Sequence, residues 1–368
     1  MESSPVPKQR FGKRADVIVH EEDPLNAETP RVALAASAVT ALDAFYVRSH
    51  GPVPELAGDR WMLRVGGLVD RPVELSLTEL RDGRHPVHEV AATLQCAGNR
   101  RAGLTAVAEI PGEAPWGPGA IGTAVWRGVA LADVLRSAGP APSATDVAFV
   151  GADRSEEADP PQPFGASIPL PKAMCPEVLL AWEMNGEPLP PVHGAPLRVI
   201  VPGYIGARSV KWLERIELRD APFDGFFQET VYRLVAPDRE AGPGIGMALG
   251  EVALNADFLL PADGERLPAG SVELRGWAFA GGDRQVERVD VSLDHGTTWR
   301  QADLMEDLGR WAWRRWRAHV DLAPGDHEIV VRAWDSAAAT QPEDPAHLWN
   351  PKGYVNNSWG RVRVHAEA

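Results

Sequence analysis

The sequence predicts an α+β protein in which a mixed α/β domain, residues 1–245, is followed by an all-β sandwich, residues 246–368. A length of 368 residues fits two domains. In the first part, apolar runs typical of strands alternate with amphipathic runs typical of helices. The stretch 236–246 is rich in Pro and Gly and marks a junction. From about Ala253 onward, short alternating segments are separated by turns, which is the spacing of a β-sandwich.

The first domain should contain several strands and at least two helices. A helix is expected to begin after Ser76, whose hydroxyl can cap the first turn together with Glu79. A second helix is expected over 131–138, because its apolar residues recur at helical spacing and Gly139 follows. The expected strands are Trp61–Val69, His85–Thr93, Val147–Val150 and Leu197–Val201.

The second domain should be built from strands alone. The segment 294–298 has the Asp and Gly residues of a hairpin turn. The segment Trp311–Arg317 mixes Trp with Arg, and we expect packed Trp side chains with the Arg side chains pointing outward. The expected strands are Ser271–Phe279, Val286–Leu293, His327–Trp334 and Arg361–His365.

Composition excludes some classes of function. A net charge of -14 argues against a nucleic-acid partner, although a local positive pocket remains compatible with it. The first residues lack the apolar stretch of a secretory signal, and no apolar run approaches the ~20 residues of a membrane span. We therefore expect a cytoplasmic protein without membrane contact, with a periplasmic location left open. Cys96 and Cys175 offer no disulfide framework.

The stretch Thr93–Arg101, which reads TLQCAGNRR, combines residue types suited to a metal and an anion. Cationic neighbours lower the pKa of a thiol, and the thiolate of Cys96 would be a soft metal ligand. Gly98 would let the backbone turn sharply, and Arg100 and Arg101 would offer forked donors to an oxyanion. The alternative is a buried structural cysteine followed by two solvated arginines.

This stretch resembles the molybdenum-ligand motif of the sulfite oxidase family, and the resemblance runs from about Ala27 to Val364. It implies a molybdopterin-binding catalytic domain followed by an immunoglobulin-like dimerisation domain, and so a homodimer. The implied cofactor is molybdenum held by molybdopterin, with Cys96 as the protein ligand of the metal. The implied reaction is the oxidation of sulfite to sulfate by oxygen-atom transfer.

The resemblance also assigns roles by position. A pterin phosphate needs Arg and Lys partners, and a pterin ring needs His or backbone partners. Taken singly, Arg48 would be a surface residue before a turn, Asp153 a turn former and Trp116 a core residue. The implied catalytic residues are Cys96, Arg48, Arg101, Tyr232, Trp116 and Lys352. The implied cofactor-binding residues are Tyr46, Val47, Arg48, Ser49, His50, Cys96, Asp153, His193, Arg198, Ser209, Val210 and Lys211.

The chain departs from the family pattern at two of these positions. Lys352 falls where animal and plant sulfite oxidases carry a substrate arginine, and a one-residue insertion precedes Trp116. Lysine keeps the positive charge but loses the bidentate geometry of a guanidinium, so the affinity for the oxyanion or its fit should change.

Two other questions stay open at this level. We find no haem-binding domain and no flavin or iron–sulfur motif, so we expect electrons to pass to a separate cytochrome-like protein or to oxygen. One alternative function is that of a nitrate-reducing molybdenum domain or another oxyanion oxidoreductase. Gln95 and Tyr232 favour the sulfite branch over nitrate reduction, and Lys352 fits neither well. A more distant alternative is a cofactor-free interaction protein, but the retained Cys96 and Arg48 argue against it.

Overall fold

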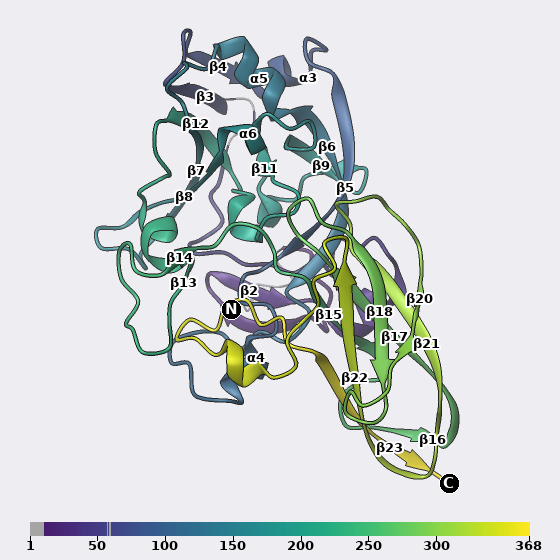
Figure 1. Ribbon diagram of the computed structural model, residues 1–368. Coiled ribbons are helices and arrows are strands. Elements are labelled where there is room, and N and C mark those ends of the chain that lie inside the picture. Colours follow the sequence, from purple (N-terminus) through teal and green to yellow (C-terminus); the bar gives the residue numbers. More distant parts are fainter. Residues whose placement is uncertain (1–10, 57, 59) are drawn as a thin grey trace, which may run out of the picture.

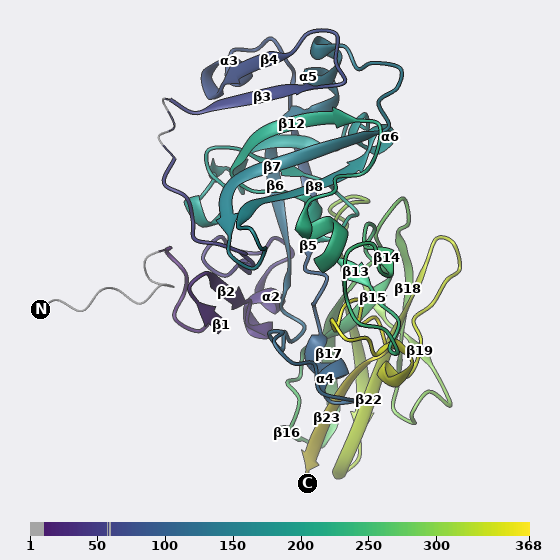
Figure 2. The same cartoon turned by 90° about the vertical axis from the view of Figure 1, so that its left-hand side faces the viewer.

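The structure is a computed structural model that describes residues 11–56, 58 and 60–368. The chain forms a larger part that contains the first domain and an elongated lobe of strands that ends at the C-terminus (Figure 1). Figure 2 shows that the lobe lies against the lower side of the larger part. The predicted α+β architecture with a C-terminal β-sandwich is confirmed.

Two five-stranded sheets form the frame of the first domain. The first has the order β4–β3–β12–β7–β8, and only the pairing of β12 with β3 is parallel. The second has the order β10–β9–β6–β5, with β11 paired to β9. The strands of the first sheet are β4 (Val73–Ser76), β3 (Met62–Gly67), β12 (Leu213–Arg219), β7 (Asp146–Ser155) and β8 (Gln162–Pro169). Those of the second are β10 (Glu187–Pro188), β9 (Leu179–Met184), β6 (Ile121–Ala130), β5 (Val87–Gln95) and β11 (Arg198–Ile200).

Short helices and two small hairpins complete this domain. Ser76 caps α3 in a reciprocal capping box with Glu79, as predicted. Helix α5 buries its apolar face and ends at Gly139, whose φ of 71° suits glycine, again as predicted. The helices are α2 (Arg31–Ala36), α3 (Leu77–Arg81), α4 (Arg101–Thr105), α5 (Leu131–Ala138), α6 (Leu170–Ala173), η1 (Pro191–His193), η2 (Gly206–Arg208) and the π-helix η3 (Phe227–Val231). The hairpin strands are β1 (Ile18–Glu22), β2 (Leu25–Glu28), β13 (Arg233–Leu234) and β14 (Met247–Ala248).

The second domain is a sandwich of two sheets whose inner faces share one apolar core. Phe258 and Trp316 meet edge to face in this core, 5.4 Å apart. Trp313 and Trp316 are buried as predicted, but Arg315 is also buried and pairs with Glu306 instead of pointing outward. One sheet contains β15 (Asn255–Leu260), β17 (Gly270–Phe279), β21 (Arg314–Leu322) and β20 (Asp303–Leu304). The other contains β16 (Glu265–Pro268), β23 (Gly360–Glu367), β22 (Gly325–Asp335), β18 (Val286–Ser292) and β19 (Arg300–Gln301), and η4 (Pro345–Leu348) precedes β23.

The two domains share side-chain packing at their junction. Trp277, Phe279 and Trp313 of the sandwich belong to the same apolar cluster as the core of the first domain. The backbone N–H of Trp313 donates to the Thr93 hydroxyl in β5, 2.8 Å away. The strand that leads to Cys96 is therefore fixed by both domains. The boundary between residues 245 and 246 falls inside the β13–β14 hairpin, so it stays a prediction.

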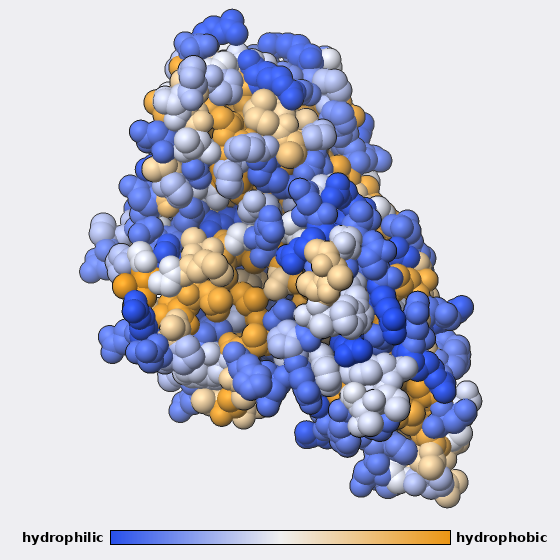
Figure 3. Space-filling view, in the orientation of Figure 1, coloured by the Kyte–Doolittle hydropathy of each residue, from blue (hydrophilic) through white to orange (hydrophobic). Residues whose placement is uncertain are grey.

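An apolar area on the outer surface lies near the predicted site. In Figure 3, apolar side chains gather over the position of β13 and β14, and Met247 of β14 is 63% exposed. Since β13 directly follows Tyr232, this area adjoins the region of the predicted site. Among the described residues, no helix has the length and apolar character needed to cross a bilayer.

Candidate cofactor cavity and anion site

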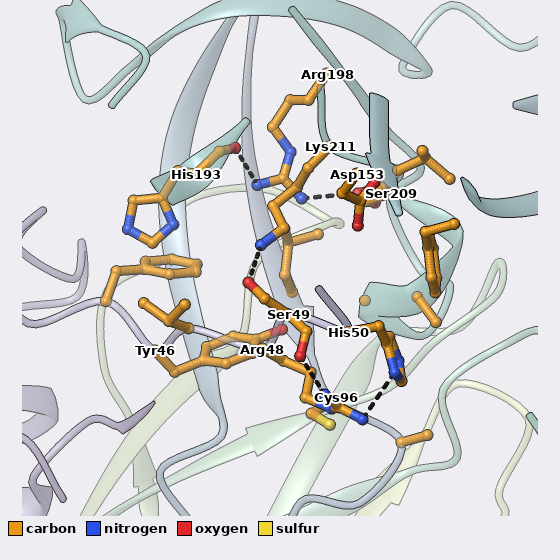
Figure 4. Close-up of a pocket in the computed structure, with 18 of the residues that line it drawn as sticks. Tyr46, Arg48, Ser49, His50, Cys96, Asp153, His193, Arg198, Ser209 and Lys211 are labelled. Carbon is orange, nitrogen blue, oxygen red and sulfur yellow. Dashed lines mark hydrogen bonds between the residues drawn. The ribbon is translucent and has the colours of Figure 1, made fainter. Parts of the chain in front are cut away.

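A cavity in the first domain brings most of the predicted site residues together (Figure 4). The space between its lining atoms, including the part open to solvent, amounts to about 660 Å³. The predicted residues that line it are Tyr46, Val47, Arg48, Ser49, His50, Cys96, Asp153, His193, Arg198, Ser209, Val210, Lys211 and Tyr232. The remaining three, Arg101, Trp116 and Lys352, do not line it and lie beside it.

Asn26 of β2 holds the segment that forms one wall of the cavity. Its side-chain amide donates to the carbonyl of Ser49 at 3.2 Å, and its side-chain oxygen accepts from the Ser49 N–H at 2.8 Å. Val47 also exchanges two backbone hydrogen bonds with Ala27. Arg48 is thus delivered to the cavity by a fixed backbone. Asn26 had no signal in the sequence, because its role depends on a contact between distant segments.

Cys96 follows the end of β5 and is buried in an aromatic cluster that includes Trp116 and Tyr46. Burial raises the pKa of the Cys96 thiol, and Arg48 and Arg101 act in the opposite direction without prevailing. The expectation of a lowered thiol pKa is therefore wrong for the cofactor-free protein. A coordinated metal removes the thiol proton outright, so the fit to a metal is unaffected.

The two adjacent arginines point to different parts of the molecule. Arg100, at a φ of 65°, sends its guanidinium to the second domain and pairs with Asp257 at 2.7 Å. Arg101 turns back toward Gly98, where a Cβ would come within 2.7 Å of the guanidinium. The hypothesis of two anion-binding arginines is therefore corrected to Arg101 alone. Gly98 is needed for the close approach of Arg101, not for a positive φ.

Basic groups gather at the end of the cavity that is remote from Cys96, as Figure 4 shows. The Arg198 guanidinium donates to the carbonyls of His193 and Ser209, at 2.9 and 2.8 Å. The Lys211 ammonium donates to the Ser49 hydroxyl at 2.8 Å. Burial lowers the pKa of Lys211 to about 7 and raises that of Asp153 to about 6. This end is an electropositive pocket that an anion would stabilise.

The cavity fits a pterin cofactor that carries a phosphate. Arg198 Nε and Asp153 Oδ1 are buried and have no hydrogen-bond partner among the described residues. Buried polar atoms are normally paired, so these two are free to bind a ligand that offers both an acceptor and a donor. Basic groups at one end and a thiol at the other suit a ligand with a phosphate and a soft metal at its two ends.

Lys13 is a further basic residue that sequence reasoning missed. Its ammonium donates to the carbonyls of Leu42 and Phe45 and lies 2.7 Å from His193 Nε2. Burial lowers its pKa to about 7. Burial of the His193 ring, together with the nearby Lys13 charge, holds the pKa of His193 well below its usual value. Nothing in the local sequence around Lys13 indicates this position, because the contact spans 180 residues.

His50 links the cavity to a phenol and a carboxylate. Burial lowers the pKa of His50 to about 4, so the ring is neutral at pH 7. Its Nδ1 lies 2.7 Å from Glu157 Oε1 and 3.0 Å from Arg48 Nη2, and its Nε2 is hydrogen-bonded to the Tyr232 hydroxyl at 2.7 Å. Burial also raises the pKa of Tyr232. Tyr232 therefore keeps its proton and offers a hydroxyl at the cavity wall.

Arg101 and Lys352 meet at a carboxylate beside the cavity. Glu113 Oε2 lies 3.2 Å from Arg101 Nη2, and its Oε1 accepts from Lys352 Nζ at 2.8 Å. Arg101 also covers the ring of Tyr354, which stacks on Tyr232 with centroids 5.6 Å apart. The sequence suggested no role for Glu113 or Tyr354.

Trp116 is buried and packs on His20, with ring centroids 4.6 Å apart. The loop around it is held by Glu28, whose carboxylate accepts from the N–H groups of Gly117 and Gly119. Its membership of the cluster around Cys96 is compatible with a wall near the metal. Its contact with substrate stays a prediction.

The lowered lysine pKa values predict how the stability of the cofactor-free protein depends on pH. Lys13 and Lys211 bind protons less readily when folded, so the unfolded chain binds more protons above pH 7. The free energy of unfolding should therefore rise from about pH 7 to about pH 8, where the cysteines and tyrosines of the unfolded chain are still mostly protonated. Denaturant titrations at several pH values measure this. The Lys211→Met variant should show a smaller rise, and an equal slope in both proteins would contradict this explanation.

Comparison with known proteins agrees with this geometry. Residues 50–227 match a family model described as the oxidoreductase molybdopterin binding domain. Residues 248–367 match the Mo-co oxidoreductase dimerisation domain, which supports a homodimer. The chain is also similar to the sulfane dehydrogenase SoxCD from Paracoccus pantotrophus, with a TM-score of 0.81, 25% identity and coverage of 100% of this chain and 93% of that one.

The sequence relatives are similar over nearly the whole chain. Sulfite oxidase from Gallus gallus is 42% identical over 93% of this chain and 76% of its own. Sulfite oxidase from Arabidopsis thaliana is 39% identical over 94% of this chain and 92% of its own. The chain spans 65% of the length of human mitochondrial sulfite oxidase, to which it is 41% identical. A fold, a cavity and a thiol position that suit a molybdopterin cofactor coincide with these similarities, and the chain belongs to the sulfite oxidase family of molybdopterin-dependent oxidoreductases.

Proposed function

We propose that this protein oxidises sulfite to sulfate by oxygen-atom transfer and passes two electrons to an external acceptor. The observation that carries this proposal is the place of Cys96, which lines the electropositive cavity and whose thiol feels the charges of Arg48 and Arg101. A thiol in that place can ligate a metal held by a pterin in the cavity, while the cations hold an oxyanion beside it. The bound cofactor would supply the oxygen-atom transfer and take up the electrons.

Each nearby side chain then has a physical task. Arg48, Arg101 and Lys352 would orient the sulfite oxyanion by charge and hydrogen bonding. Tyr232 would keep a protonated hydroxyl near the reacting oxygen, because burial holds its pKa high, and its hydrogen bond to His50 would fix the position of the hydroxyl. Trp116 and the aromatic cluster around Cys96 would limit access of water to the metal.

The remaining predicted residues would hold the cofactor. Arg198 and Lys211 lie at the basic end of the cavity and would bind its phosphate, and the neutral His193 beside them would contact the pterin ring. Asp153 has an unpartnered oxygen that can accept from a pterin N–H. Lys13 adds a positive charge next to His193. We expect the acceptor to be a cytochrome-like protein or oxygen.

A substrate panel with an artificial electron acceptor tests this function. The purified, molybdenum-loaded protein should reduce the acceptor with sulfite. It should reduce nitrate slowly or not at all when supplied with a reduced dye. Nitrate serves as the comparison because nitrate reductase from Hordeum vulgare is 38% identical over 93% of this chain. Rapid nitrate turnover without sulfite oxidation would assign the protein to the alternative reaction.

Replacing Lys352 tests the third cation of the proposed substrate site. Lys352→Met removes a charge-assisted hydrogen bond worth about 1–3 kcal/mol, so KM for sulfite should rise roughly ten- to a hundredfold if KM follows binding. Lys352→Arg retains the charge and should not show this loss. Steady-state kinetics of both variants measure the effect. An unchanged kcat/KM in Lys352→Met would show that Lys352 does not bind the substrate.

A further inference from the structure

An acidic side chain lies between two of the cations assigned to the substrate. The Glu113 carboxylate contacts Lys352 Nζ through one oxygen at 2.8 Å and Arg101 Nη2 through the other at 3.2 Å. The two carboxylate oxygens thus contact the two cations in the way that two oxygens of a bound oxyanion would. Glu113 comes from the loop between α4 and β6, and Lys352 from the segment between η4 and β23. The carboxylate therefore bridges two domains at the anion site.

The bridge lies close to the reacting region. Arg101 and Glu113 both act electrostatically on Cys96, and Glu113 also acts on Tyr232. Arg101 lies over the ring of Tyr354, which stacks on Tyr232. A carboxylate in this position faces the same groups as the sulfite oxyanion would.

Arg101 is buried and held by several contacts, whereas Glu113 and Lys352 are partly exposed to solvent. The Arg101 guanidinium donates to the carbonyls of Lys352 and Ala114, and the side chain is only 3% exposed. A Cβ on Gly353 would come within 2.6 Å of Arg101 Cγ, so the arginine is closely packed on this side. The side chains of Glu113 and Lys352 are 17% and 27% exposed. An arriving anion can therefore displace the carboxylate while the guanidinium stays in place.

We propose that Glu113 is an internal competitor that occupies the oxyanion position between Arg101 and Lys352 and gives way to sulfite. This inference rests on the proposed function for the identity of the substrate. A tethered group competes at an effective concentration on the order of millimolar. Ions that bind weakly, such as chloride, do not displace it, whereas an oxyanion that reaches both cations does. Glu113 thus selects oxyanions that reach both cations over weakly bound ions such as chloride, and it helps the sulfate product to leave.

The Glu113→Gln variant tests this competition, because it keeps the shape of the side chain and removes its charge. Calorimetric titration with sodium sulfate should show a dissociation constant lower by about tenfold, the lower end of the range for a charge-assisted hydrogen bond. KM for sulfite should also fall, and inhibition by sodium chloride should become stronger. The control is Glu183→Gln, which removes a carboxylate 2.9 Å from Arg127, away from the cavity, and should change none of these values.

A purely structural role of Glu113 would give different results in these measurements. If Glu113 only braces the two domains, Glu113→Gln should bind sulfate no better than the wild type and should unfold at a lower temperature. That pair of results would overturn the proposal. The sulfate titration needs no turnover, so it decides this inference even if the wild type fails to oxidise sulfite. Failure of sulfite oxidation with tighter sulfate binding in Glu113→Gln would refute the proposed reaction and leave the competitor role supported.

Discussion

Replacing Cys96 with serine should abolish sulfite oxidation and leave the fold intact. The serine hydroxyl is close to the thiol in size, so the packing around the 6% exposed residue should persist. A hydroxyl is a poor ligand for a metal that prefers sulfur. Mutation of residues outside a ligand set already costs 10- to 100-fold in metal affinity or activity, so the loss here should exceed about a hundredfold. Turnover per bound molybdenum measures it.

The matched control for this variant is Cys175→Ser. Cys175 is partly exposed, its thiol contacts the carbonyl of Pro171, and it does not line the cavity. Its replacement should leave turnover unchanged. Wild-type turnover by a metal-loaded Cys96→Ser protein would remove Cys96 from the mechanism.

Replacing Arg100 with methionine should have the largest effect on stability. Its guanidinium pairs with Asp257 at 2.7 Å and donates to Asn255 and to the carbonyls of Ser358 and Trp359. Removal of one partner from such a buried pair leaves an uncompensated charge, which costs about 3–5 kcal/mol. Burial already opposes the charge and lowers the pKa of Arg100. Chemical denaturation should show the loss, together with weaker coupling of the two domains.

Two measurements separate this structural role from a role in substrate binding. Arg127→Met removes a partly exposed ion pair that solvent screens, and it should destabilise the protein far less than Arg100→Met. The folded fraction of Arg100→Met should retain the wild-type KM for sulfite, because Arg100 faces the second domain. A large rise in KM without loss of stability would show that Arg100 binds the substrate anion.

The parts of the site that the sequence predicted are those fixed by local motifs. Cys96, Arg48 and the basic residues of the cavity stand in long stretches that resemble the family, and the structure places them around one space. The helix over Leu131–Ala138 and the cap at Ser76 were also predictable, since their signals lie within a few residues. Local patterns determined these features because their physical causes are local.

The features that sequence reasoning missed depend on distant contacts or on the backbone. Lys13 reaches His193 across 180 residues, and Glu113 meets Lys352 across 239. Arg100 and Arg101 are adjacent in sequence, yet the left-handed backbone at Arg100 separates their side chains. The pKa of Cys96 depends on burial, which outweighs the cations that the sequence made visible. Such outcomes follow from three-dimensional packing and are not encoded in any short stretch.

The most direct test of the proposed metal site is X-ray absorption at the molybdenum edge of the purified protein. The central claim is that the cavity holds a molybdenum–pterin cofactor with Cys96 as the protein ligand. We expect bound molybdenum in the wild type, with one sulfur ligand more than in a molybdenum-loaded Cys96→Ser variant. An identical sulfur count in the two proteins, or a wild type that binds no molybdenum when produced with the cofactor available, would contradict that claim.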